Sequence, residues 1–297
     1  MSTRAGATSV RRGEQDAVDI FRVPSEAQEM TLYHYTTQTG LLGIITSREV
    51  WATHHQCLND PKEFVHAKEL FREELASRGP SPITEAMQRT LQGEGLESVD
   101  MYVASFSEDS DSLSQWRAYG GPTSSFSLGF DRVAPPSRFK MRRCIYQEDR
   151  QREWARNVVD GILRKLQELD PKILEGTKSV EQYIPLDCRL PLHESALVLK
   201  HPKFAEEKEW RIFSEVMMDD PPNQEKNPLD FREGKSALVP YRRVPLKNNE
   251  GGFPLTEIVV GPSPDPERSR RTVLSLLRSR GLANCHVRTS DVPYRNW

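Results

Sequence analysis

The chain has 297 residues, 36% of them hydrophobic and 28% charged, with a formal net charge of −2. This composition is typical of an ordinary globular protein on the polar side and excludes a disordered or membrane-embedded chain. No apolar run approaches the ~18 residues that a transmembrane helix needs, and residues 1–30 lack an apolar signal-peptide core, so we expect a cytoplasmic protein with no membrane partner. Four cysteines without CxxC spacing predict neither disulfides nor a metal site.

The chain is long enough for one large domain or two, since a domain takes about 100–200 residues. We expect one α+β domain over residues 31–297, preceded by a loose, polar N-terminal arm at 1–30. A helical insertion is predicted near 147–200, where a long amphipathic pattern replaces the strand signals.

Apolar periodicity predicts the elements in chain order. Alternation predicts strands at 31–36, 50–53, 101–106, 125–130 and 139–146. Helical spacing predicts helices at 40–46, about 59–77, 84–92 and 150–169, the second starting at an Asn-Asp-Pro capping sequence. Three prolines mark 218–235 as a surface excursion. A strand at 257–260, an arginine-rich helix ending at 280 and a strand at 286–289 predict a closing β-α-β unit.

The first candidate constellation is LYHYTT, in which His34 lies in the middle of a predicted strand. Alternation places His34 and Thr36 on one face, and Tyr33 and Tyr35 on the other. A histidine there can hydrogen-bond ribose hydroxyls or an amide, and a nearby threonine can support it. The alternative is a core histidine whose hydrogen bonds are satisfied by the protein itself.

The second constellation is ASFSEDSDSLSQWRAYGG, where a buried strand runs into small, hydroxylated and acidic residues. Ser105 and Ser107 share a face at a strand-to-loop junction, which is where ligands are usually met. Trp116 or Tyr119 can stack on a flat heteroaromatic ring. The alternative is a helix with Asp111 as its N-cap, Trp116 in the core, and the neighbouring arginine paired to a surface acid.

The third constellation is HPKFAEEKEWRIF, a turn entering a strand whose alternation places Trp210 and Ile212 inward. Glu207, Glu209 and Arg211 then share the other face. Two such carboxylates can hold one acid at a sugar hydroxyl while the other polarises an incoming nucleophile. The alternative is a solvated face of charged residues.

The ordered motifs YHYT, WAT, LND-P, SFSED, QWRxYG and EKEWRIF together resemble a bacterial family catalogued only as a domain of unknown function, over about Leu32 to Arg295. That family in turn looks like the ADP-ribosyltransferase superfold, which includes DarT-type DNA-modifying toxins and RNA 2′-phosphotransferases. The resemblance implies a split, strongly bent β-sheet that cradles NAD as substrate.

By the same resemblance, His34 would bind a ribose of NAD, the Ser105–Ser107 strand would line the nicotinamide side, and Glu207 or Glu209 would be the catalytic acid. Of the two glutamates we favour Glu209. This sequence lacks the aromatic-rich nicotinamide motif of the diphtheria-toxin class, so the stacking residue stays open between Phe106, Trp116 and Tyr119. The candidate NAD-binding residues are His34, Tyr35, Thr36, Ser105, Phe106, Ser107, Trp116, Arg117, Tyr119 and Arg211.

The resulting functional hypothesis is an NAD-consuming ADP-ribosyltransferase or NAD glycohydrolase, which by analogy alone would be a toxin or anti-phage effector. Breaking the nicotinamide–ribose bond builds positive charge on the sugar, and a carboxylate stabilises that charge as it develops, so the reaction needs no metal. The acceptor, protein or nucleic acid, is left open. The alternative is a non-catalytic module on the same fold that senses a nucleotide or nucleic acid, suggested by local arginine clusters.

Overall fold

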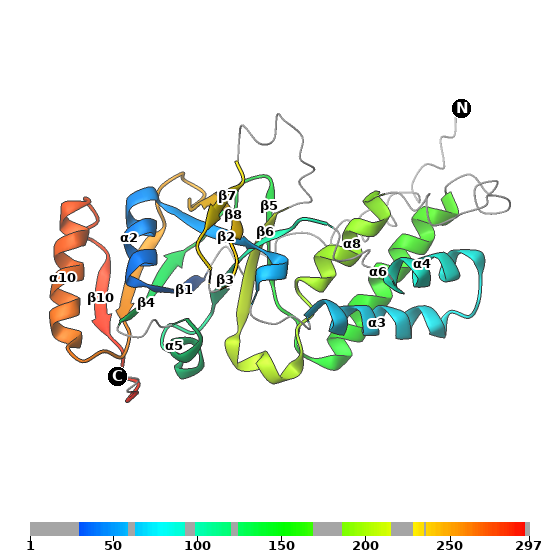
Figure 1. Ribbon diagram of the computed structural model, residues 1–297, viewed down its shortest axis with the longest axis horizontal. Helices are drawn as coiled ribbons and strands as arrows, with labels where there is room; N and C mark the ends of the chain where they lie inside the picture. The colour runs from blue at the N-terminus through cyan, green and yellow to red at the C-terminus, as the bar shows by residue number, and fades with distance from the viewer. Residues whose placement is uncertain are drawn as a thin grey trace, which may run out of the picture.

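A large, mostly antiparallel sheet with helices on both faces organises the chain (Figure 1). The computed structural model describes residues 30–58, 63–92, 99–119, 124–168, 186–214, 228–234 and 236–294. The strands are β1 (Thr31–Thr37), β2 (Glu49–His54), β3 (Tyr102–Ser107), β4 (Ser125–Asp131), β5 (Phe139–Arg143), β6 (Glu209–Ser214), β7 (Asp230–Arg232), β8 (Val239–Pro245), β9 (Leu255–Val260) and β10 (His286–Thr289). The α-helices are α2 (Gln38–Ser47), α3 (Glu63–Ser77), α4 (Pro82–Gln92), α5 (Leu113–Tyr119), α6 (Glu148–Glu168), α8 (Leu186–Ala196) and α10 (Pro266–Ser279), and the 3-10 helices are η2 (His55–Cys57) and η5 (Pro202–Glu207).

Most predicted elements are confirmed within the described residues. The closing unit is present, because β9 and β10 pair in parallel with α10 between them, and Asp265 caps that helix by accepting a hydrogen bond from Arg268 N at 2.9 Å. The helix expected from 59 is described from Glu63 onward, while 59–62, the arm at 1–29 and most of the excursion at 218–235 lie outside the described residues. Strand β8 was not predicted, since its two prolines and two arginines break the apolar alternation.

Strand β3 divides the sheet. Along one edge of β3, β1 pairs at Tyr33–Ser107 and β2 pairs at Thr53–Val103 and His54–Tyr102, whereas β6 pairs with Val103 to Ser107 along the other edge. The strand order is β10-β9-β4-β1-β3-β2-β8-β7, with β6 on β3 and β5 on β6. Because β1 and β2 pair only with opposite ends of β3, the middle of β3 has no partner strand on that edge among the described residues.

The strand register defines two faces of the sheet. The face that we call the core face carries Leu32, His34, Phe106 and Trp210, and α2 and α10 cover it. The opposite face, called the α5 face, carries Tyr35, Ser105, Ser107, Glu209 and Arg211. Helix α5 covers part of that face, and α3, α4, α6 and α8 gather over its far end, on the right of Figure 1.

The strand β6 is buried on both faces. This excludes the alternative of a solvated charged face, because α3 and the end of α8 cover the side that carries Glu209 and Arg211. The sheet and the helices thus form a mixed α/β architecture. Within the described part of the chain, no helix is both long enough and apolar enough to span a membrane.

Candidate active site

Five charged side chains meet where β6 begins, and we call them the charged cluster: Glu63, Lys200, Glu207, Glu209 and Arg211. The Lys200 Nζ donates to Glu207 Oε2 at 2.5 Å and to Glu209 Oε2 at 2.6 Å. The Arg211 guanidinium donates to Glu209 Oε1 at 2.8 Å and to both carboxylate oxygens of Glu63, at 2.6 and 2.8 Å. The cluster therefore contains three carboxylates and two cations. Each of these residues except Glu207 has less than a tenth of its surface exposed.

A sharp corner in the backbone brings Glu207 and Glu209 to the same ammonium. Lys208 adopts a left-handed conformation with φ +43°, which ends η5 and lets β6 begin at Glu209. Two hydrogen bonds from the end of β3 hold this corner. Ser107 Oγ donates to Glu207 O at 2.7 Å, and the N–H of Glu108, the residue after β3, donates to Lys208 O at 3.1 Å. Glu207 thus lies on a 3-10 helix, not on the strand as predicted, yet its carboxylate still reaches the partner of Glu209.

The chain anchors both cations through its backbone. Lys200 follows α8, donates its N–H to Ile145 O at 3.1 Å, and accepts from the Gln151 amide at 2.7 Å. Arg211 also donates to Leu197 O at 2.7 Å. The charged cluster consequently ties α3 and the end of α8 to the sheet. Removing one partner of any ion pair in the cluster would weaken this attachment.

The two glutamates have opposite electrostatic environments. Burial works to raise the pKa of Glu209, but Arg211 and Lys200 outweigh it and hold the pKa at about 2. Burial also raises the pKa of Glu207, which Lys200 opposes only in part. The Glu207 side chain is 18% exposed against 6% for Glu209. Neighbouring carboxyls whose pKa values are driven apart are the usual arrangement of an acid and a permanently charged partner.

Three further side chains border the charged cluster. Tyr119, partly exposed at the end of α5, has its pKa raised to about 12 by burial, with Glu209 and Glu207 adding to the effect. Tyr146 Oη accepts from Glu209 N at 2.9 Å. The Cys144 thiol lies 3.7 Å from Glu209 Oε2, and burial raises its pKa, so it is not a thiolate at neutral pH.

His34 lies on the other side of the sheet from Glu209. Its Nδ1 is 2.9 Å from Ser105 O, in the gap where β1 leaves β3, and its ring is 5.5 Å from that of Phe106. A carbonyl oxygen only accepts, so Nδ1 carries the proton, and burial lowers the pKa of His34. Nε2 is then an acceptor. Thr36 lies on the same face as His34. Because Glu209 lies on the opposite face, the structure does not bring the His34 side chain together with the glutamates.

The aromatic candidates occupy different environments. Trp116 is 1% exposed and packs edge-on against Tyr35, with ring centroids 4.7 Å apart, while Phe106 is buried in the core face. Of the three rings considered for stacking, Tyr119 alone is partly exposed. Arg117 is exposed and lies over the Tyr294 ring at 5.3 Å.

The polar residues of the second constellation are largely engaged within the protein. The Ser107 hydroxyl holds the η5 corner, and Tyr35 Oη donates to Asp109 O at 2.7 Å. Asp111 is not the cap of α5, which begins at Leu113; its Oδ1 instead accepts from the Trp116 indole at 2.7 Å. Ser105 is partly exposed on the α5 face, and its carbonyl accepts from His34.

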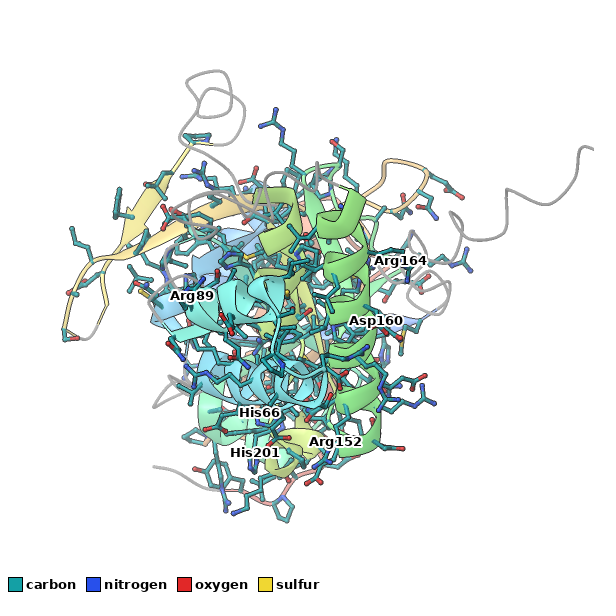
Figure 2. All side chains as sticks on the ribbon, turned by 90° about the vertical axis from the view of Figure 1, so that its right-hand side faces the viewer. His66, Arg89, Arg152, Asp160, Arg164 and His201 are labelled. Atoms are coloured by element: carbon teal, nitrogen blue, oxygen red, sulfur yellow. The ribbon has the colours of Figure 1, made fainter. Side chains whose placement is uncertain are left out.

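The histidines do not gather into a metal centre. His54 pairs with Asp100 at 3.0 Å. His66 and His201 lie side by side beside η5 (Figure 2), with ring centroids 5.6 Å apart, and His66 bonds Gln151 Oε1 at 3.0 Å. Among the described residues, no three His, Cys, Asp or Glu side chains are placed to hold a metal ion.

Sequence reasoning missed Glu63 and Lys200, although each lies directly beside a motif that it singled out. Glu63 follows LND-P, and Lys200 directly precedes the HPKF turn. Nothing in their spacing relates them to each other or to Arg211, because Glu63 begins α3, Lys200 lies in the segment after α8, and Arg211 lies on β6. A single lysine or glutamate beside a motif carries too little signal to be selected.

A family of proteins of unknown function, DUF2971, has a model that matches residues 115–212. The matched stretch contains four of the five residues of the charged cluster: Lys200, Glu207, Glu209 and Arg211. No curated protein and no solved structure matches the chain. The similarity therefore supports a domain of unknown function, and these comparisons offer no evidence for the resemblance to ADP-ribosyltransferases.

Proposed function

We propose that this protein cleaves the nicotinamide–ribose bond of NAD, as an NAD glycohydrolase or an ADP-ribosyltransferase, with Glu207 as the carboxylate that meets the substrate. The observation that carries the proposal is the pairing of Glu207 and Glu209 on one ammonium with their pKa values driven in opposite directions. Glu209 is too enclosed to touch a ligand directly. Its role is to hold Lys200 and Arg211.

The charge balance of the cluster suits this reaction. With all groups ionised, three carboxylates face two cations, which leaves an excess negative charge in a largely dry site. When the C1′–N bond breaks, its electron pair leaves with nicotinamide and the ribose becomes positively charged. A fixed negative charge nearby stabilises that transition state more than the ground state, since NAD already carries its positive charge farther away, on the nicotinamide ring.

The second half of the reaction needs a proton acceptor. Water, or the nucleophile of an acceptor molecule, adds to C1′ and gives up a proton. Glu207 in its ionised form can take that proton, and its raised pKa brings it closer to the range where a general base is effective. Tyr119, beside the carboxylates, is the ring that could contact the nicotinamide side.

Two features of the fold agree with a ligand at this place. The sheet splits at β3, which resembles the split sheet that the family resemblance implies. Ser105, in the split, is partly exposed on the same face as Glu209. His34 faces the other way, so the proposal gives it no contact with the ribose carbon under attack.

The test is nicotinamide release from NAD by the purified protein, with and without cell lysate as a source of acceptor. Glu207→Gln should lower the rate about 100-fold or more, which is the usual loss when a general acid or base is removed. Glu206→Gln is the matched control, because Glu206 is the exposed neighbour on the same 3-10 helix. The proposal is wrong if wild type releases no nicotinamide under either condition, or if Glu207→Gln matches wild type.

A non-catalytic nucleotide-binding module is the second candidate. It is favoured by one observation: every acceptor oxygen of Glu209 is taken by Arg211 or Lys200, as expected of a structural brace. This reading predicts calorimetric binding of NAD or ADP-ribose without turnover. Binding that survives in Glu207→Gln, together with no nicotinamide release by wild type, would favour it.

A further inference from the structure

The loop between β3 and α5 is tied to the C-terminal end of the described chain through one carboxylate. Asp111 Oδ1 accepts from the Trp116 indole at 2.7 Å and from Ser290 Oγ at 2.5 Å, and Oδ2 accepts from Asp291 N at 2.8 Å. Arg288 lies 3.7 Å from the same carboxylate. The Asp111 side chain is only 15% exposed, so these donors take the place of water.

The residues after β10, which we call the C-terminal strap (290–294), also hold α5 by packing. Val292 packs against the cluster that Tyr35, Trp116 and Val259 form. The Tyr294 ring lies under the Arg117 guanidinium at 5.3 Å. Helix α5 is therefore fixed from two sides, by β1 beneath it and by the strap beside it.

Helix α5 has little stability of its own. It has seven residues, far fewer than the ~12–15 that even a favourable isolated helix needs in water. Its last residue is Tyr119, and α5 contacts η5, which ends at Glu207. The place of the Tyr119 ring beside the two carboxylates therefore depends on what holds α5.

We infer that Asp111 is a positioning residue for the candidate site: it fastens α5 to the C-terminal strap and so sets the place of Tyr119 beside Glu207 and Glu209. No other residue in the described part of the chain bonds both α5 and the strap through one side chain. The relevance of Asp111 to catalysis rests on the proposed function. The effect of Asp111 on the position of Tyr119 does not depend on that function.

The chemistry of the carboxylate points to a specific variant. An ionised aspartate accepts at both oxygens, whereas an asparagine accepts at one and donates at the other. Asp111→Asn can keep the Trp116 and Ser290 bonds, but its amide group meets Asp291 N donor to donor. The variant should therefore loosen the C-terminal strap without creating a cavity, because asparagine has nearly the same volume as aspartate.

Two measurements test the position of Tyr119 without turnover. At pH 11 a phenol with a pKa of about 12 is about 9% ionised, and one with the ordinary value of 10 is about 91% ionised. Ultraviolet titration, with Tyr119→Phe in each background to isolate the signal, should show a clearly larger ionised fraction in Asp111→Asn than in wild type. Hydrogen exchange of the α5 amides should accelerate at least 10-fold, while exchange in β9 is unchanged.

The matched control is Glu257→Gln, which removes a carboxylate of similar exposure on β9 that bonds Arg288 and Tyr33 but not α5. Nicotinamide release should fall about 10-fold in Asp111→Asn, with a larger change in KM than in kcat. Unchanged Tyr119 ionisation and α5 exchange would overturn the inference, as would equal changes in Glu257→Gln. If wild type releases no nicotinamide while Asp111→Asn still frees Tyr119, the proposed function fails and the positioning role stands.

Discussion

Removing the Arg211 guanidinium should destabilise the fold more than removing any surface arginine. Arg211 is 3% exposed and donates to Glu63, Glu209 and the Leu197 carbonyl. In Arg211→Met, the volume is roughly kept, but two buried carboxylates lose their main cation. Breaking a buried pair by removing one partner costs about 3–5 kcal/mol of unfolding free energy.

The pKa of Glu209 gives an independent magnitude. A native value of about 2 instead of the ordinary 4.5 corresponds to roughly 3 kcal/mol of native-state stabilisation at neutral pH, supplied by Arg211 and Lys200 together. The native pKa is the lower one, so this stabilisation is fully present above pH 4.5 and is lost as the pH falls from 4.5 towards 2. Arg211→Met should therefore lose stability mainly at neutral pH and differ much less from wild type near pH 2.

Urea denaturation at neutral pH, followed by circular dichroism, measures the difference in unfolding free energy. Arg143→Met is the control, because Arg143 is half-exposed and pairs with Glu108 at the surface, where an ion pair contributes at most about 1 kcal/mol. A loss below about 1 kcal/mol for Arg211→Met, at an unchanged m-value, would refute the view that the charged cluster braces the fold.

Two further predictions concern close packing and histidine charge. Gly261→Ala should lower the free energy of unfolding by about 1–3 kcal/mol in thermal or urea denaturation, because its new methyl group would meet Ser125 Oγ and come within 2.9 Å of the Trp116 ring. Gly43 lies in the middle of α2 with no atom within 4 Å of the new methyl position, so the control Gly43→Ala should raise the free energy of unfolding by about 0.5–1 kcal/mol. Equal effects of the two substitutions would contradict the packing argument. Because burial lowers the pKa of His34 from 6.5, the native state favours its neutral form, so this stabilisation is present above pH 6.5 and is lost as the pH falls below it. The melting temperature should therefore fall less between about pH 7.5 and pH 5.5 in His34→Gln than in wild type, and an identical fall would contradict the assignment.

Local pattern predicted most elements because it reports local physics. Alternation located β1, β4 and β10, and helical spacing located α6 and α10. The assignment of Glu207 to a strand failed at Lys208, whose left-handed backbone conformation has no signature when the residue is not glycine, asparagine or aspartate.

The relation between the candidate residues could not be predicted. Alternation says which residues of one strand share a face, but not how that face relates to a face of another strand, which is set by register. His34 and Glu209 belong to strands that never pair directly, and the register through β3 turns them to opposite faces. Glu63 begins α3 and Lys200 lies in the segment after α8, so the charged side chains around Glu209 come together only in the folded chain.

The sharing of β3 by β1, β2 and β6 has a consequence for how the chain acquires its structure. Thr53 in β2 pairs with Tyr241 in β8, and Val103 in β3 pairs with Phe213 in β6, so the central strands find their neighbours only after most of the chain has been made. Contacts this distant in sequence make folding slow, because the chain loses conformational entropy in closing the long loops before the contacts can stabilise it. During synthesis, β2 and β3 wait with open backbone edges, and newly made chains should be more prone to aggregate than finished ones.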